Sequence, residues 1–133
     1  SMKRDMSLAR MILLELEKSE MGRYGNGELK LPEIDGYQEA TIKHHCYLLY
    51  QAGLLEGVEG RSRGETRDGP MIYPLWLTWK GHDFVDAVRS DTLWNRAMEK
   101  IKDKIESASF DLLFEFTTAL GKSILFAGES LSG

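Results

Sequence analysis

The chain has 133 residues, with 17 lysines and arginines against 21 aspartates and glutamates, so its formal net charge is −4. This length suits one compact domain, and a hydrophobic share of 42% excludes an intrinsically disordered chain. A single cysteine, Cys46, excludes an intramolecular disulfide. Because the sequence shows neither a secretory leader nor an apolar run long enough to span a bilayer, we expect a cytoplasmic protein without membrane attachment. The mild acidity argues against a non-specific polyanion binder.

Two amphipathic helices are predicted in the first half of the chain. Asp5 is a suitable N-cap for the first, which covers about residues 5–19. Residues 29–34 then read as a short extended piece. The second helix covers roughly residues 38–52 and ends at Gly53, the residue best suited to a left-handed cap. Its apolar side carries Ile42, His45, Cys46 and Leu49, and its opposite side carries Lys43, His44, Tyr47 and Gln51.

A two-stranded hairpin and further helices are predicted to follow. Residues 54–58 and 71–79 have strand-like patterns, and the connection between them is too long for a tight turn. Pro74 cannot donate to a ladder, so its strand should lie at an edge or begin after it. Helix N-caps are expected at Thr78, at Ser90 or Asp91, and at Ser109, whose helix runs to about Phe126.

This order of elements is that of a winged-helix module: a helix, a short strand, a second helix and then a hairpin. Residues 41–55 resemble the recognition-helix signature T-[VI]-x-x-H-L-x-x-L-x-x-A-G-L-[VIL] of ArsR-like repressors, with Cys46 in place of the usual leucine. Downstream, Leu77-Thr78-Trp79-Lys80-Gly81 resembles the L-T-x-x-G motif that follows the wing in many such proteins. One departure is that residues 28–37 contain Pro32 and Gly36 where a repressor has a helix bracing the recognition helix.

More specifically, the chain resembles a bacterial and prophage family, domain of unknown function 2513. The matching pieces are Met2-Lys3-Arg4-Asp5-Met6, Ile34-Asp35-Gly36-Tyr37, the segment from His45 to Leu54, Leu77-Thr78-Trp79-Lys80-Gly81-His82-Asp83-Phe84 and Asp91-Thr92-Leu93-Trp94-Asn95. The resemblance implies a winged-helix fold and supplies no activity. We therefore expect an α+β, mostly helical protein: a winged helix-turn-helix-like domain over residues 2–90, a C-terminal helical extension over 91–127 and a flexible tail over 128–133.

The candidate DNA contacts lie on the second helix and in the hairpin connection. On the helix they are Gln38, Lys43, His44 and Tyr47, which could reach base edges or phosphates, although an ordinary solvated face is the alternative. The wing arginines Arg61, Arg63 and Arg67 could contact phosphates. However, three acidic residues in the same connection bring its charge to zero, which suits a soluble loop equally well.

Other chemistry-bearing residues favour ordinary structural roles. His45 lies on the apolar side of its helix, which favours a hydrogen-bonded core histidine over a ligand. His82 and Asp86 are four residues apart, but no third metal ligand accompanies them, so an exposed ion pair or a cap is the better interpretation. Gly121-Lys122-Ser123 lacks the first glycine of a phosphate loop. We expect no metal, no cofactor and no enzymatic activity.

The last predicted helix is apolar over much of its circumference, so it should be buried on more than one side. Its own domain can cover one side and a second copy of the chain the other, which predicts a homodimer; the acidic first turns disfavour a membrane-surface helix. The residues expected at the dimer contact are Phe110, Leu113, Phe114, Phe116, Leu120 and Ile124.

Two functional hypotheses remain open. The first is a winged-helix protein that binds double-stranded DNA and acts as a transcriptional or phage-related regulator. The second is a winged-helix module that binds another protein and no DNA, which the net acidity, the missing brace helix and the neutral wing favour.

Overall fold

The structure is a computed structural model that describes residues 3–18, 29–60 and 70–102. Within these ranges the chain forms four helices and two strands, in the order α1 (Met6–Lys18), α2 (Glu39–Gln51), β1 (Leu55–Gly60), β2 (Met71–Leu77), α3 (Trp79–Val88) and α4 (Asp91–Lys102). The predicted α+β, mostly helical composition is therefore confirmed for this part of the chain. Contacts divide the chain into two compact units, Ser1–Val85 and Asp86–Gly133.

Helix α1 begins where the sequence places its N-cap. The Asp5 carboxylate Oδ1 accepts the Leu8 backbone N–H at 3.1 Å, and the Asp5 carbonyl accepts the N–H of Ala9 at 3.0 Å. The first bond satisfies a donor that has no partner within the helix, and the second is the first regular bond of the helix. The buried face of α1 carries Leu8, Ala9, Ile12, Leu13 and Leu16.

Helix α2 lacks a side-chain cap at its N-terminus but has a complete cap at its C-terminus. Gln38, at the N-cap, has an extended backbone and no side-chain cap bond. At the other end, Gly53 has a φ of +77°, and its N–H donates to the Tyr50 carbonyl at 3.0 Å. The N–H of Leu54 donates to the Leu49 carbonyl, also at 3.0 Å. This pair of bonds is a Schellman motif, so the predicted left-handed glycine cap is confirmed.

Strands β1 and β2 form a two-stranded antiparallel sheet whose register shifts between Glu56 and Gly57. Pro74 lies inside β2 and is the partner of Gly57, next to this irregularity. A strand of a two-stranded sheet has a free edge, so the prediction that Pro74 would lie on an edge strand is confirmed. Residues 29–34 were expected to be extended, and no strand is formed there.

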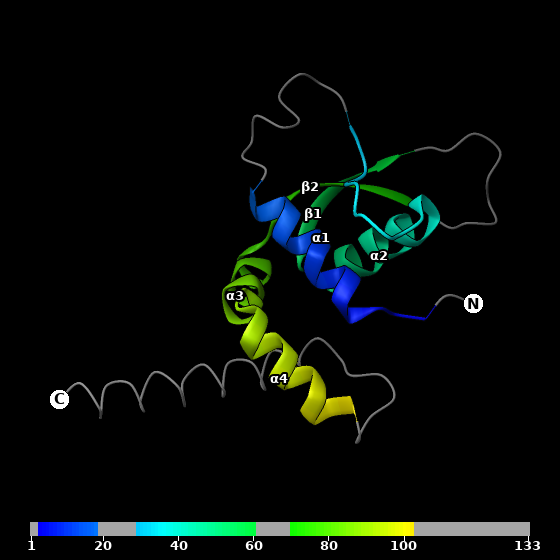
Figure 1. Cartoon of the computed structure of the whole chain (residues 1–133). Helices are drawn as coiled ribbons and strands as arrows, with labels where there is room; N and C mark the ends of the chain where they lie inside the picture. Colours follow the sequence, from blue (N-terminus) through cyan, green and yellow to red (C-terminus); the bar gives the residue numbers. More distant parts are fainter. Residues whose placement is uncertain (1–2, 19–28, 61–69, 103–133) are drawn as a thin grey trace. The chain divides into compact units, whose positions relative to one another are not determined.

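The core of the first unit lies where α1, α2 and the hairpin meet. Helix α1 contacts α2 and β2, and α2 contacts both strands. In Figure 1 the two helices lie next to each other, with the sheet behind α1. The fully buried side chains include Ile12, Leu13, Leu49, Leu54 and Leu55. One face of α2 is therefore packed in the core.

Helices α3 and α4 are both capped by hydroxyl side chains. The Thr78 Oγ1 accepts the Gly81 N–H at 3.0 Å, which confirms the cap predicted for α3. The Ser90 Oγ accepts the Leu93 N–H at 3.2 Å, so Ser90 is the cap of α4, and Asp91 lies in its first turn. In the second unit, Trp94 and Ala97 of α4 are buried.

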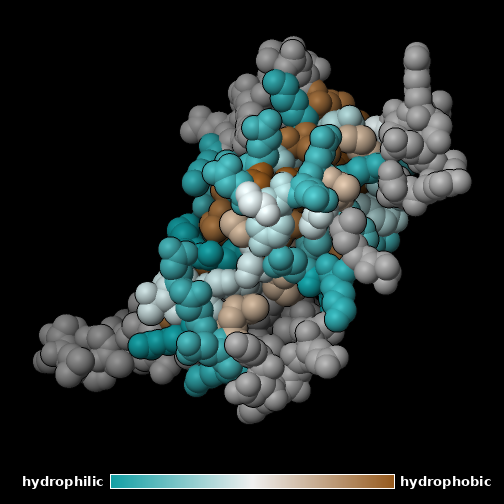
Figure 2. All heavy atoms as spheres, turned by 45° about the vertical axis from the view of Figure 1, so that its right-hand side comes forward, coloured by the Kyte–Doolittle hydropathy of each residue, from teal (hydrophilic) through white to brown (hydrophobic). Residues whose placement is uncertain are grey.

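Several predictions fall outside the described ranges. They concern the wing arginines Arg61, Arg63 and Arg67, the dimer residues Phe110, Leu113, Phe114, Phe116, Leu120 and Ile124, and the tail over 128–133. Among the helices that the structure describes, none is long and apolar enough to cross a membrane. The face in Figure 2, which brings forward the side where α2 lies in Figure 1, is largely hydrophilic, with apolar residues visible between the polar ones.

Candidate nucleic-acid interface

The outer face of α2 presents polar side chains at the positions predicted from the helical period. Lys43, His44 and Tyr47 are half-buried, whereas Gln38 and Gln51 are exposed. The Gln51 amide donates to the Tyr47 hydroxyl at 3.0 Å, a bond between residues one helical turn apart. The structure thus brings Lys43, His44 and Tyr47 onto one helix, with Gln38 immediately before it.

The inner face of α2 is buried. Ile42, His45, Cys46 and Leu49 are each at most 4% exposed. Removal of Cys46 from water disfavours its charged form, so burial raises the pKa of this thiol to about 12. The division into a packed face and a polar face is the one that the sequence predicts.

His45 is a core histidine held by two hydrogen bonds, as predicted. Its Nε2 accepts the Asp5 backbone N–H at 2.7 Å, and its Nδ1 lies 2.8 Å from the Thr41 carbonyl. Since a backbone N–H can only donate, Nε2 must be the unprotonated nitrogen, and Nδ1 carries the hydrogen donated to Thr41. This neutral tautomer joins the start of α1 to the first half of α2.

Asp5 also connects the segment before α2 to the contact between α1 and His45. Its Oδ2 accepts a hydrogen bond from the Tyr37 hydroxyl at 3.1 Å, across 32 residues of sequence. Desolvation, together with this hydrogen bond and the Asp5 charge, raises the pKa of Tyr37, so the phenol stays a donor at neutral pH. Asp5, Tyr37 and His45 therefore tie α1, the segment before α2 and α2 itself into one network, which we call the N-terminal junction.

A second set of contacts holds the C-terminal end of α2, and we call it the C-terminal junction. The Thr78 hydroxyl donates to the Gly53 carbonyl at 2.6 Å, and the Thr78 N–H donates to the Leu54 carbonyl at 3.2 Å. The Lys80 ammonium lies 3.4 Å from the Ala52 carbonyl. Gly81 packs so closely here that a Cβ added to it would collide with the Leu54 carbonyl oxygen. Both ends of α2 are thus anchored by named contacts.

His44, one residue before His45, lies in a different environment. It is half-buried, and its ring meets the His45 ring edge-on, with 5.7 Å between the ring centroids. Desolvation, followed by the proximity of His45, lowers the pKa of His44. His44 is therefore neutral at neutral pH and offers the interface a hydrogen-bonding ring rather than a cation.

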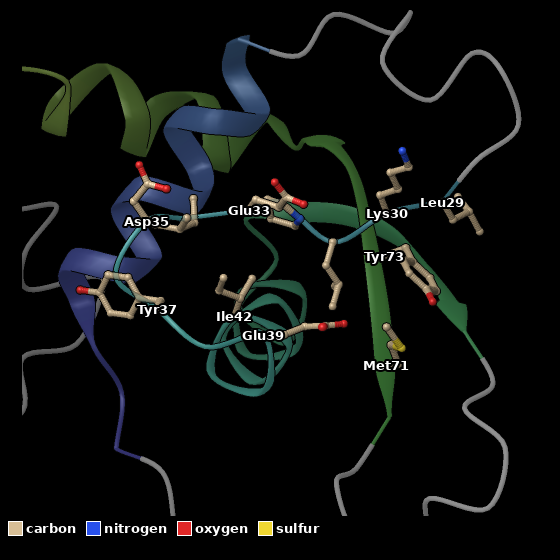
Figure 3. A pocket seen from close by; sticks show the side chains of 12 residues that line it. Leu29, Lys30, Glu33, Asp35, Tyr37, Glu39, Ile42, Met71 and Tyr73 are labelled. Atoms are coloured by element: carbon tan, nitrogen blue, oxygen red, sulfur yellow. The ribbon is translucent and has the colours of Figure 1, made fainter.

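A cavity of about 420 Å³ lies beside the N-terminal end of α2. It is bounded by residues 29–34, by Asp35 and Tyr37 of the turn that follows them, by Glu39 and Ile42 of α2, and by Met71 and Tyr73 of β2 (Figure 3). Sequence reasoning missed this cavity because its walls come from three separate segments. The Ile34-Asp35-Gly36-Tyr37 motif is readable in the sequence, but the bond from Tyr37 to Asp5 is not.

The groups considered for metal binding do not gather into a site within residues 3–18, 29–60 and 70–102. No cluster of three or more histidine, cysteine, aspartate or glutamate side chains is found there. The Asp86 carboxylate pairs with Arg89 at 2.8 Å, an exposed contact within the last turn of α3 and the residue after it.

Comparison with known proteins shows the family. The family model described as Hypothetical protein (DUF2513) matches residues 3–107, which include both junctions, and the chain belongs to this family. A relative from Haemophilus influenzae, described as an uncharacterized protein, is 34% identical over 124 residues, or 93% of this chain and 96% of the relative. No solved structure matches the chain. The family resemblance expected from the sequence is therefore confirmed, and its description names no activity.

Proposed function

We propose that this protein is a winged-helix DNA-binding regulator and that the outer face of α2 enters the major groove. The observation that carries the proposal is the state of α2: one face is buried, both ends are anchored, and Lys43, His44 and Tyr47 remain on the outer face. A helix held in this way can insert its outer face into a groove while its inner face keeps its core contacts.

The order of the elements supports the same proposal. Helices α1 and α2 and the β1–β2 hairpin come in the sequence order expected of a winged-helix module, while segment 29–38 forms neither a strand nor a bracing helix; the proposal gives α2 the role of the recognition helix. In such a docking, residues near the N-terminus of the recognition helix meet base edges. Gln38 can pair with adenine, and Glu39 can accept from the amino group of cytosine. The wing arginines and a dimer formed by residues 91–127 belong to this proposal as further contacts to backbone and half-sites.

The experiment is a selection of duplexes from a random library by the full chain, followed by fluorescence anisotropy on the selected sequence. Lys43→Ala and Tyr47→Ala should each weaken binding about tenfold, since single contacts to phosphates or bases contribute roughly 1–3 kcal/mol. Lys18→Ala is the matched control: it removes a cation from α1, where the Lys18 side chain is 78% exposed. Equal affinities of all variants, or no enrichment of any sequence, would contradict the proposal.

One observation favours the second candidate function, a protein-interaction module. Glu33, Asp35 and Glu39 all line the cavity at the N-terminal end of α2, where a recognition helix approaches DNA. Three carboxylates there repel phosphates and suit a basic protein surface. Under this alternative, the wild-type chain would enrich no duplex in the selection, and a basic protein partner would be retained by the wild-type chain but not by Glu39→Gln or Asp35→Asn.

A further inference from the structure

We propose that the cavity beside α2 is a binding site for a small organic cation with an apolar body, such as an amine or a guanidinium compound. The proposal goes beyond DNA binding and does not depend on it. The volume of the cavity, about 420 Å³, lies within the range of small-molecule sites, which is roughly 300–1,000 Å³.

The walls of the cavity are suited to an apolar body. Leu31 and Ile42 line it from the extended segment and from α2, and Met71 and Tyr73 line it from β2. Leu29 also lines the cavity and is 41% exposed, so part of this apolar side chain is in contact with water. A ligand that covered Leu29 and the Tyr73 ring would remove this apolar area from water.

The preference of the cavity for a cation comes from Glu39, whose carboxylate lies between α2 and β2. The lining of the cavity contains three carboxylates, those of Glu33, Asp35 and Glu39, and one ammonium group, that of Lys30. Figure 3 shows the Glu39 side chain pointing from α2 toward β2, while the Lys30 and Glu33 side chains lie on the other side of the extended segment. An ammonium or guanidinium head placed next to Glu39 would therefore meet a carboxylate on the side of the segment away from Lys30.

Aromatic and conformational features add to this match. The Tyr73 ring can take a cation on its face. Tyr37 also lines the cavity, and its hydroxyl donates to Asp5, whose N–H donates in turn to His45. A ligand that packs on the segment 29–37 would thus stabilise the N-terminal junction as well as fill the cavity.

The test compares three probes with the same body and different heads: 4-phenylbutylammonium, 4-phenylbutan-1-ol and 4-phenylbutyrate. Binding to the full chain is followed by ¹H–¹⁵N chemical-shift titration, without DNA, so its outcome is independent of the proposed function. We expect the ammonium compound to bind about fivefold more tightly than the alcohol, the upper end for an exposed ion pair, and the carboxylate to bind most weakly. The shifts should concentrate at Glu39, Met71 and Tyr73.

Two variants separate the head from the body. Glu39→Gln should bring the ammonium and the alcohol to equal affinity, whereas Glu56→Gln, an exposed carboxylate outside the cavity, should leave the fivefold ratio intact. Met71→Gln should weaken all three probes alike. Equal binding of the ammonium and the alcohol to the wild-type chain, or a ratio that survives Glu39→Gln, would overturn the proposal. Tighter binding of the peptide acetyl-Ala-Arg-Ala-amide than of the ammonium would also overturn it, because the occupant would then be a side chain of a protein partner.

Discussion

His44 and His45 are neighbours in the sequence, yet they differ in burial and in hydrogen bonding on α2. His45 is 2% exposed and bonded at both ring nitrogens, whereas His44 is half-buried, and its ring contact is the edge of His45. Since consecutive residues of a helix point about 100° apart, one falls on the core stripe and the other outside it. The role of a histidine here is set by its angular position on the helix.

The same contrast separates the two faces of α2 as a whole. Packing and anchored ends fix the inner face, and the outer face contributes an exposed bond between Gln51 and Tyr47. Changes on the inner face should therefore alter stability or reactivity, and changes on the outer face should alter binding alone.

The largest expected difference concerns Cys46. With a pKa of about 12 against the ordinary 9.0, its thiolate fraction near neutral pH is about a thousandfold lower than that of a free cysteine. We expect reaction with a disulfide reagent at pH 8 to be slow in the folded chain and fast in guanidinium. Because the folded thiol holds its proton more tightly, the free energy of unfolding should also fall as the pH rises from about 9 to about 12. Equal rates in the folded and unfolded chains would contradict burial of the inner face.

His45→Ala should destabilise the chain by about 4 kcal/mol. The substitution leaves the Asp5 N–H and the Thr41 carbonyl without their partner and opens a cavity in the core. His44→Ala is the matched control and should change stability by less than about 0.5 kcal/mol. Urea denaturation followed by circular dichroism measures both, and similar losses for the two variants would refute the difference between the neighbouring histidines.

Two glycines test the C-terminal junction in different ways. Gly81→Ala should cost about 3 kcal/mol because the new methyl group meets the Leu54 carbonyl oxygen. Gly53→Ala should cost only about 1 kcal/mol, since the space around Gly53 is open and the strain comes from its φ of +77° alone. Thermal unfolding of the two variants should rank them in this order, and the reverse order would show that Gly81 is not close-packed.

Gln51→Ala should have the smallest effect, a change in stability within about 0.5 kcal/mol. It removes the exposed hydrogen bond to Tyr47 and no buried contact. A loss above about 1 kcal/mol in urea denaturation would mean that the outer face takes part in holding the fold.

Much of the first unit could be predicted because its signals are local. The Asp5 and Thr78 caps, the Gly53 stop and the packed His45 all follow from residue type and helical spacing within a few positions, and the structure confirms each of them. Local signals suffice where a backbone group must find a partner within its own turn.

What could not be predicted depends on contacts between distant segments. The Tyr37–Asp5 bond spans 32 residues, and the cavity needs three segments to form its walls. Pro74 lies within β2 because the register shifts beside its partner Gly57, a detail of pairing that neither strand encodes alone. The same limit explains why Glu39 was not proposed as a site residue, although its neighbour Gln38 was.

If the outer face of α2 contacts a duplex, its affinity for that duplex must depend on the salt concentration. For the selected duplex, the slope of log K against log salt concentration should become less negative by about 0.9 in Lys43→Ala if Lys43 neutralises one phosphate. The slope of Lys18→Ala should equal that of the wild-type chain. Identical slopes for all three proteins, or binding that does not respond to salt, would contradict the account.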